Sequence, residues 1–299
     1  MSNNNLFDRD GSIFMGSQNN PKDCKVGIFG ANYDGTTSYK PGTRFGPCAI
    51  RNASYSLESY CPQVNKDLED IKYYDAGSAI LNLKDTKHVI QSVDLATRYL
   101  IDKKLKPLLL GGEHSITVGA IQALIEKFPK LILVQLDAHA DLRESYQSNK
   151  FSHACAIKRC LEIMPSKKIF QIGIRSGTKE EFKIMKDKKQ LINFKTGEPN
   201  THLKKTLEPF KNHPIYLTID LDWFDPSLVS GTGTPEPGGY FWHDFDNIIQ
   251  TLNSFRIIGA DIVELSPDID VSGVSSVVAA KVVRSLIMIL DNTSTKELI

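Results

Sequence analysis

Two short motifs in the chain combine side chains that bind metal ions, at a spacing that brings them together. The motif DAHAD (137–141) follows an apolar run at 131–136, and DLD (220–222) follows another at 215–219. In an extended chain, residues two apart point to the same side. The aspartate and histidine side chains of each motif are therefore expected to converge, which favours metal binding.

A third motif, GGEHS (111–115), offers His114 after two glycines that allow the chain to turn tightly. Each motif alone is a weak signal, because alternating acids often cap strands and a lone histidine is usually structural. Three motifs at the ends of apolar runs are harder to explain in that way. The candidate metal ligands are His114, Asp137, His139, Asp141, Asp220 and Asp222.

These candidate ligands are carboxylates and imidazoles without a thiolate, which argues against a structural zinc site. Oxygen-rich ligands with some imidazole suit Mn²⁺. Six side chains serve two ions if some of the aspartates bridge them. Four aspartates, two divalent ions and a hydroxide leave the centre negative, so a cationic substrate is favoured. Paired metals also lower the pKa of bound water, which gives a nucleophile near neutral pH.

The elements that must position these residues follow from the apolar runs. Runs of strand length stand at 25–29, 107–112, 131–141, 168–176, 214–222 and 256–265. Most are apolar at successive positions, as in strands that are buried on both faces. Helix-like spacing appears at 86–103, 116–127 and 271–290. The alternation predicts a three-layer α/β/α domain with a mainly parallel sheet, and ligands of such sheets gather at the carboxyl ends of the strands.

We expect one catalytic domain over residues 23–299, because no linker or repeat divides the chain. Residues 1–22 are rich in Asn, Ser and Asp and are expected to form an N-terminal arm. The formal net charge of +1 gives no reason to expect a nucleic-acid partner. Lys281 and Arg284 interrupt the most apolar late stretch, which argues against a membrane span.

The five cysteines form no zinc-binding or CxxC spacing, and the polar N-terminus lacks the pattern of a signal peptide. Both observations favour a reduced, cytoplasmic enzyme.

The sequence resembles the ureohydrolase family, which includes arginases and agmatinases. The matching segments are TTSYKPGTRFGPCAIR (36–51), GGEHS (111–115), DAHAD (137–141), SHA (152–154), TIDLDWFDP (218–226), GTGTPEPGG (231–239) and DIVELSP (261–267). The resemblance implies the arginase fold, a centre of two Mn²⁺ ions and hydrolysis of a guanidinium group to urea. It also implies a homotrimer or homohexamer.

Residue roles follow from the resemblance. It implies that one metal is bound by His114 and Asp141 and the other by His139 and Asp222, while Asp137 and Asp220 bridge the two ions. Glu264 would bind the guanidinium group of the substrate. His153 would transfer protons, although from the residues alone a structural position at a helix start is the simpler interpretation.

The members of the family differ in the part of the substrate that lies opposite the guanidinium group. In the residues that would recognise this part, the sequence most resembles agmatinases. Arginases carry an Asn for the substrate carboxylate where this chain has Arg143, which weakens an arginase assignment. Glu236 could face the amine of agmatine, or it could only brace a Gly/Pro-rich loop; the two alternatives are equally favoured. Trp223 could pack in the core, or it could narrow the pocket towards another guanidino compound.

Agmatine, cleaved to putrescine and urea, is therefore the predicted substrate. Arginine and 4-guanidinobutyrate are the alternatives. A non-catalytic metal-binding relative ranks lower because every ligand is present. Glu264 and the segment 231–239 argue against deacetylation of an acylated polyamine.

Overall fold

A computed structural model of the chain describes residues 6–9, 11–188, 191–192 and 201–292. Its centre is a nine-stranded sheet with the order β1-β5-β2-β6-β11-β10-β7-β8-β9. The strands of this sheet are β1 (Phe7–Asp8), β2 (Val26–Ala31), β5 (Tyr73–Ala79), β6 (Lys106–Gly111), β7 (Ile132–Leu136), β8 (Ile169–Ile172), β9 (Leu191–Ile192), β10 (Ile215–Asp220) and β11 (Ile257–Val263). Every pairing is parallel except that of β1 with β5.

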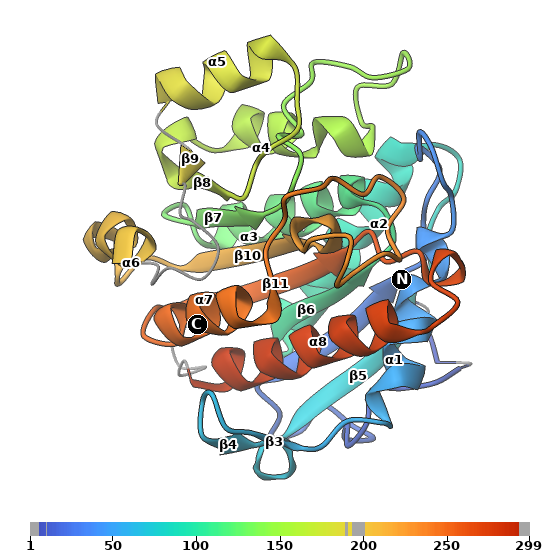
Figure 1. The fold of residues 1–299 in the computed structure, drawn as a ribbon. Helices are drawn as coiled ribbons and strands as arrows, with labels where there is room; N and C mark the ends of the chain where they lie inside the picture. The colour runs from blue at the N-terminus through green and yellow to red at the C-terminus, as the bar shows by residue number, and fades with distance from the viewer. Residues whose placement is uncertain (1–5, 10, 189–190, 193–200, 293–299) are drawn as a thin grey trace.

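Helices cover both faces of this sheet, and a separate pair of short strands, β3 (Tyr60–Cys61) and β4 (Lys66–Asp67), lies at one end of the molecule (Figure 1). The α-helices are α1 (Gly46–Ser54), α2 (Thr86–Asp102), α3 (Thr117–Lys127), α4 (Ala156–Ile163), α5 (Lys179–Lys188), α6 (Thr201–Leu207), α7 (Trp242–Leu252) and α8 (Val274–Asn292). In Figure 1, α1, α7 and α8 lie in front of the sheet, and α2, α3 and α4 lie behind it. The predicted three-layer α/β/α architecture is confirmed.

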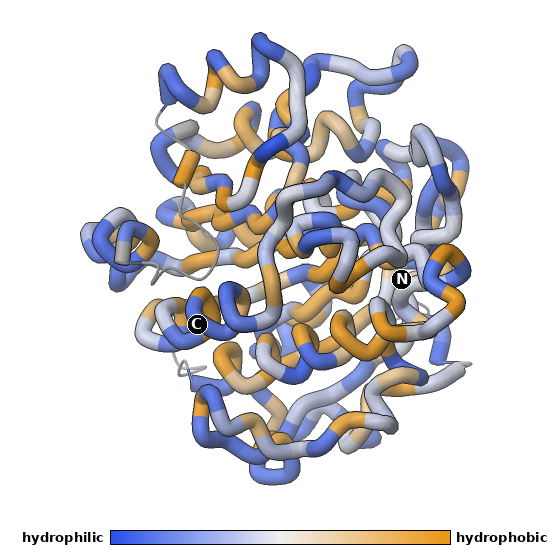
Figure 2. Tube along the Cα trace, viewed as in Figure 1, coloured by the Kyte–Doolittle hydropathy of each residue, from blue (hydrophilic) through white to orange (hydrophobic). Residues whose placement is uncertain are grey.

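The strands are apolar on both faces because each face has its own core. Along β6, Leu108 and Leu110 belong to the core under α1, α7 and α8, whereas Leu109 belongs to the core under α2, α3 and α4. Successive side chains of a strand point to opposite faces, so a strand between two helical layers needs no polar position. Figure 2 shows these hydrophobic strands in the middle of the molecule and hydrophilic loops around them.

The described part of the expected N-terminal arm packs onto the domain. β1 adds an antiparallel edge strand beside β5. Phe14 is fully buried, and its backbone N–H donates to Asp75 at 2.9 Å. Backbone pairing and one buried aromatic ring thus hold the described residues of this segment against the domain.

Each of the six strands expected from the apolar runs is present, but β5 was not expected. Asp75 interrupts the apolar character of β5 and is nevertheless fully buried, because Arg51 donates to both of its oxygens at 2.8 Å. The last expected helix begins at Val274 rather than at 271. Asp270 accepts hydrogen bonds from the backbone N–H groups of Ser272 and Ser275 and holds a turn there.

Among the described residues, no helix combines the length and the apolar character that a bilayer span requires.

Candidate active site

The carboxyl ends of four neighbouring strands, β6, β11, β10 and β7, carry the predicted metal ligands and Glu264, as expected for a parallel sheet. The register explains the grouping. Ile219 of β10 pairs with Leu136 of β7, so the next residues, Asp220 and Asp137, leave the sheet side by side. Asp220 also pairs with Val263 of β11, which directly precedes Glu264.

The first cluster surrounds Nδ1 of His114. This nitrogen lies 3.1 Å from Oδ2 of Asp137, 3.1 Å from Oδ2 of Asp141 and 3.4 Å from Oδ2 of Asp220. All four residues are buried. Three carboxylate oxygens around one imidazole nitrogen form a ligand set for a hard or borderline divalent ion.

The second cluster surrounds Nδ1 of His139, which lies 2.8 Å from Oδ2 of Asp222 and 3.9 Å from Oδ1 of Asp137. Asp137 thus turns one oxygen to each histidine. Among the described residues, the two groups with metal-binding geometry, His114–Asp137–Asp141 and Asp137–His139–Asp222, share this aspartate. A shared carboxylate is the arrangement that a pair of adjacent ions requires.

Two features of the side chains in these clusters indicate that a cation binds among them. Nδ1 of His114 is buried and faces three carboxylate oxygens, but it makes no hydrogen bond with them. Burial, together with the charges of Asp222 and Asp141, raises the pKa of Asp137 to about 7. Buried carboxylates this close together repel one another, and divalent ions between them would offset that repulsion.

A chain of hydrogen bonds behind His114 aims its Nδ1 at the cluster. Nε2 of His114 lies 2.9 Å from the hydroxyl of Thr218, and Thr218 donates to Asp261 at 2.5 Å. Because the only hydroxyl hydrogen of Thr218 goes to Asp261, Nε2 must be the donor in the bond with Thr218. Nδ1 is then left with a free lone pair, as metal ligation requires.

Two of the site residues have backbone angles that non-glycine residues rarely adopt. Asp141 has φ 53° and Glu264 has φ 66°. Such conformations cost free energy and cluster at functional sites. Glu264 is fixed from both sides, since its N–H donates to the carbonyl of Gly112 at 2.9 Å and its Oε1 accepts from the N–H of His114 at 2.7 Å.

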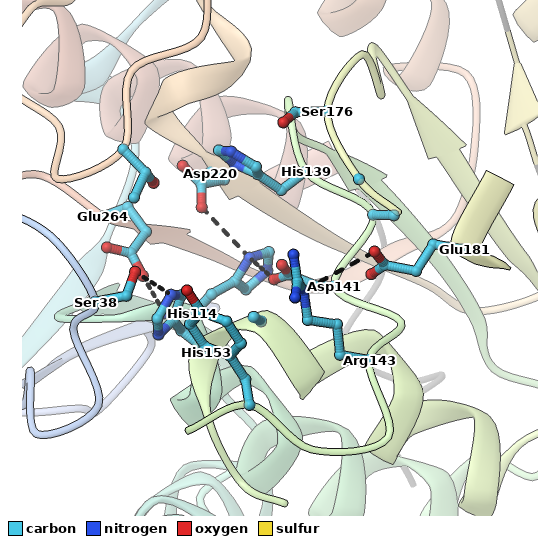
Figure 3. Close-up of a pocket in the computed structure, with 15 residues that line it drawn as sticks. Ser38, His114, His139, Asp141, Arg143, His153, Ser176, Glu181, Asp220 and Glu264 are labelled. Atoms are coloured by element: carbon cyan, nitrogen blue, oxygen red, sulfur yellow. Dashed lines mark hydrogen bonds and ion pairs between the residues drawn. The ribbon is translucent and has the colours of Figure 1, made fainter. Parts of the chain in front are cut away.

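These residues open into a cavity of about 240 Å³. Its lining consists of Ser38, His114, His139, Ala140, Asp141, Arg143, Tyr146, His153, Ala154, Ser176, Gly177, Glu181, Asp220, Thr234 and Glu264. Figure 3 shows Glu264 and Ser38 on one side of this cavity and Glu181 on the other. Carboxylates therefore line the cavity on both sides, and the guanidinium of Arg143 lies 4.0 Å from the carboxylate of Glu181.

His153 lies in this cavity near Ser38, which belongs to a loop far away in sequence (Figure 3). Its Nε2 is 3.4 Å from Oγ of Ser38, and its Nδ1 is 3.2 Å from Oγ1 of Thr36. The position is suitable for proton transfer to a group bound in the cavity.

The structure does not bring Glu236 or Trp223 to the cavity lining. Trp223 is fully buried, and its ring stacks on that of Tyr240 with 4.7 Å between the centroids. It therefore packs in the core and does not narrow the cavity. The backbone carbonyl of Glu236 accepts from Arg175 at 2.8 Å, and that of Asp222 accepts from the same guanidinium at 2.6 Å. Arg175 therefore ties the Gly/Pro-rich loop to the ligand motif.

Three contributors to the site were not identified from the sequence: Thr36, Arg175 and Glu181. Arg175 stands at the end of an expected strand, so the rule that ligands gather there could have identified it. Glu181 lies in the first turn of α5, and no sequence pattern distinguishes it from its neighbour Glu180. Its carboxylate is buried because the backbone N–H groups of Leu142 and Thr178 donate to it, at 3.0 and 2.7 Å.

Comparisons with known proteins identify the family of the chain. The profile described as "Arginase family" matches residues 24–289. The chain is 38% identical over 281 residues to an agmatinase from Bacillus cereus, covering 93% of this chain and 96% of the relative. It is 37% identical over 256 residues to the N(1)-aminopropylagmatine ureohydrolase of Thermococcus kodakarensis, covering 82% of this chain and 84% of that relative.

The solved structure of the agmatine ureohydrolase of Thermoplasma volcanium superposes with a TM-score of 0.79 at 33% identity, covering 92% of this chain and 93% of the other. Sequence and structure thus agree over most of both chains, and this protein belongs to the arginase family.

Proposed function

We propose that this chain is an amidinohydrolase that cleaves agmatine to putrescine and urea. The observation that carries the proposal is the pair of ligand clusters sharing Asp137, opening into a cavity with Glu264 at one end and Glu181 at the other. The similarity to agmatinases over nearly the whole chain supports it.

Two Mn²⁺ ions are proposed as the cofactor. His114 and Asp141 would hold one, and His139 and Asp222 the other. Asp137 and Asp220 would each bridge the two ions. Oδ2 of Asp220 faces His114, and its Oδ1 accepts from the N–H of Asp222 at 2.9 Å. When bound, such a pair lowers the pKa of water and makes a nucleophile available near neutral pH.

The chain's own residues would then orient the substrate and move protons. Glu264, held by the backbone of His114, would accept hydrogen bonds from the guanidinium group and fix its carbon near the ligand clusters. His153 would deliver a proton to the departing nitrogen, since an amine leaves as a neutral molecule only after protonation. Both side chains line the same cavity.

The distal ammonium group of agmatine would meet Glu181. This replaces the earlier expectation for Glu236, which lies outside the lining. Glu181 offers an ammonium group a carboxylate of opposite charge, in addition to the backbone N–H groups of Leu142 and Thr178 that already donate to it. The carboxylate of arginine would bring like charge close to Glu181.

Arg143 favours a second candidate, 4-guanidinobutyrate. Its guanidinium lines the cavity, lies 4.7 Å from the ring centroid of Tyr146 and is 4.0 Å from Glu181. This group could pair with a carboxylate at the far end of a substrate. Agmatine is preferred because four carboxylate side chains and one guanidinium group line the cavity, which favours a dication over a substrate with a carboxylate.

The test is urea release by the chelated and Mn²⁺-reloaded protein. Agmatine, arginine, 4-guanidinobutyrate and an acetylpolyamine would be compared by kcat/KM. Agmatine is expected to exceed the others, and the chelated protein is expected to be inactive. A higher kcat/KM for arginine or 4-guanidinobutyrate would replace the substrate but keep the chemistry, whereas release of acetate without urea would overturn the reaction class.

We further propose a cytoplasmic enzyme with one catalytic domain over 23–299 that assembles as a homotrimer or homohexamer. The single nine-stranded sheet supports one domain. The small net charge gives no support for a nucleic-acid partner.

A further inference from the structure

The imidazole of His153 can hold its neutral-form proton on either ring nitrogen, and the two choices differ in what they offer the cavity. Nδ1 lies 3.2 Å from Oγ1 of Thr36, and Nε2 lies 3.4 Å from Oγ of Ser38. His153 and Ser38 line the cavity, whereas Thr36 is not among its lining residues. The hydrogen-bonding needs of Thr36 decide which nitrogen carries the proton.

A threonine hydroxyl has one hydrogen to donate and two lone pairs that accept. Oγ1 of Thr36 lies 2.6 Å from Oε1 of Glu113 and accepts from the backbone N–H of His153 at 3.0 Å. A short bond to a carboxylate is stronger than a longer bond to a neutral ring nitrogen. The hydroxyl hydrogen therefore goes to Glu113, and the remaining lone pair faces Nδ1 of His153, which can donate to it only when protonated.

Glu113 is held firmly enough to impose this choice. Its side chain is fully buried, and its Oε2 accepts from the backbone N–H of Thr36 at 2.7 Å. Its Oε1 also accepts from the hydroxyl of Ser115 at 2.6 Å. Donors thus occupy both oxygens, and the carboxylate cannot turn away from Thr36.

We propose that Thr36 is a positioning residue, which together with Glu113 fixes the neutral tautomer of His153 with hydrogen on Nδ1 and a free lone pair on Nε2. This inference rests on the acid–base role of His153 in the proposed function. Nε2 is the nitrogen that would take up a proton and pass it to the departing amine. With the other tautomer, Nε2 would already carry its hydrogen and the lone pair would face Thr36.

Two other groups contact the ring. The hydroxyl of Ser152 lies 3.4 Å from Nδ1, and the ring of Tyr146 packs edge-on at 6.1 Å between centroids. Tyr146 restrains the ring plane but does not choose between the nitrogens. Ser152 is the competitor, because its hydroxyl could donate to an unprotonated Nδ1. Replacing Ser152 is therefore the matched control for replacing Thr36.

The tautomer can be measured by two-dimensional ¹H–¹⁵N NMR of the full chain labelled at histidine, which distinguishes protonated from unprotonated ring nitrogens. Mg²⁺ would replace Mn²⁺ to avoid paramagnetic broadening, and His153→Gln would assign the signal. The wild type and Ser152→Ala are expected to carry hydrogen on Nδ1. Thr36→Val, which keeps the shape but removes the hydroxyl, is expected to shift the proton towards Nε2, and Thr36→Ser to keep it on Nδ1.

Kinetics give a second measurement. Thr36→Val is expected to lower kcat about 10- to 100-fold, because the variant loses part of the roughly 10²–10⁴-fold rate contribution of a general acid or base. KM should change less than kcat. Thr36→Ser is expected to restore most of kcat.

A wild-type ring with hydrogen on Nε2, or an unchanged tautomer in a folded Thr36→Val variant, would overturn the proposal. If the tautomer is as expected but agmatine is not hydrolysed, the proposed substrate fails and the role of Thr36 in fixing the ring stands.

Discussion

At the scale of single residues, Asp137 has the most demanding position, because it is the member that the two ligand clusters have in common. Its Oδ1 also accepts from the N–H of His139 at 2.6 Å, and its Oδ2 accepts from Gln135 at 2.6 Å. These bonds orient both oxygens before any ion binds, which lowers the cost of organising the centre.

Asp137→Asn is expected to lose both metal ions. An amide offers one neutral oxygen in place of two charged ones, so it cannot serve two ions at once. Metal content after dialysis, measured by mass spectrometry, should fall from about two ions per chain to near zero. Asp268→Asn changes an exposed carboxylate outside the cavity and should keep both ions. Retention of one full equivalent by Asp137→Asn would show that the residue serves only one ion.

His153→Ala is expected to lower kcat by roughly 10²–10⁴-fold, the usual contribution of a general acid or base. The metal content should not change, because His153 belongs to neither ligand cluster. His243→Ala, at an exposed position outside the cavity, is the control. Wild-type turnover in His153→Ala would exclude the acid–base role.

Glu181→Gln and Glu236→Gln separate the two candidates for the distal ammonium group. A hydrogen bond to a charged group contributes about 1.5–3 kcal/mol, so KM for agmatine should rise about tenfold or more in Glu181→Gln. Glu236→Gln should change KM little, since Glu236 is absent from the lining. Butylguanidine, which lacks the amine, should be nearly unaffected by either change. A rise confined to Glu236→Gln would reverse the assignment.

At the scale of elements, the turn after β6 determines where His114 stands. Gly112 passes so close to another loop that an added Cβ would lie 1.9 Å from the backbone oxygen of Tyr33. The N–H of Gly112 donates to Ala31 at 2.9 Å, and its carbonyl accepts from Glu264 at 2.9 Å. The glycine is therefore required for close approach of three chain segments around the site.

Gly112→Ala is expected to destabilise the fold by about 3 kcal/mol or more, the upper range for overpacking, because backbone atoms cannot move aside. Chemical denaturation of the metal-free protein would measure the difference. Gly273→Ala is the control variant without a steric clash. Its added Cβ would meet nothing within 4 Å, although its φ of 74° is unfavourable for alanine. That variant should lose only about 1 kcal/mol. Equal losses in both variants would contradict the steric argument.

At the scale of the whole molecule, several apolar side chains remain exposed on the single chain. Val271 is 99% exposed and Tyr39 is 69% exposed. Exposed apolar groups of this kind are compatible with burial in an assembly, although scattered ones also occur on monomers.

A homotrimer or homohexamer is the expected state in solution. Light scattering coupled to size exclusion should give a mass three or six times the 33.4 kDa of the chain. Dilution through the micromolar range tests whether the assembly persists. A mass of one chain at micromolar concentration would exclude the assembly and leave the site unchanged, since every ligand comes from a single chain.

The candidate metal ligands could be identified from the sequence because their spacing is local. Two-residue spacing after a buried strand puts Asp137 and His139, and likewise Asp220 and Asp222, at the carboxyl end of a strand without knowledge of distant contacts. The three-layer architecture followed from the alternation of apolar runs and helix-like segments. β5 was not expected, because Asp75 interrupts its apolar residues and is buried only through its ion pair with the distant Arg51.

Which of these residues share one site depended on which strands became neighbours, and local sequence patterns do not encode the strand order. Only the β6-β11-β10-β7 arrangement brings His114, Glu264, Asp220 and Asp137 together. Thr36 and Glu181 reach the site from loops and helices far away in sequence, held by hydrogen bonds that no periodicity reveals. Glu236 has the right charge in a family motif, yet Arg175 holds the loop with that side chain outside the cavity lining. The sequence alone thus determined the chemistry of the candidate ligands and the type of sheet, whereas long-range packing decided which side chains line the cavity.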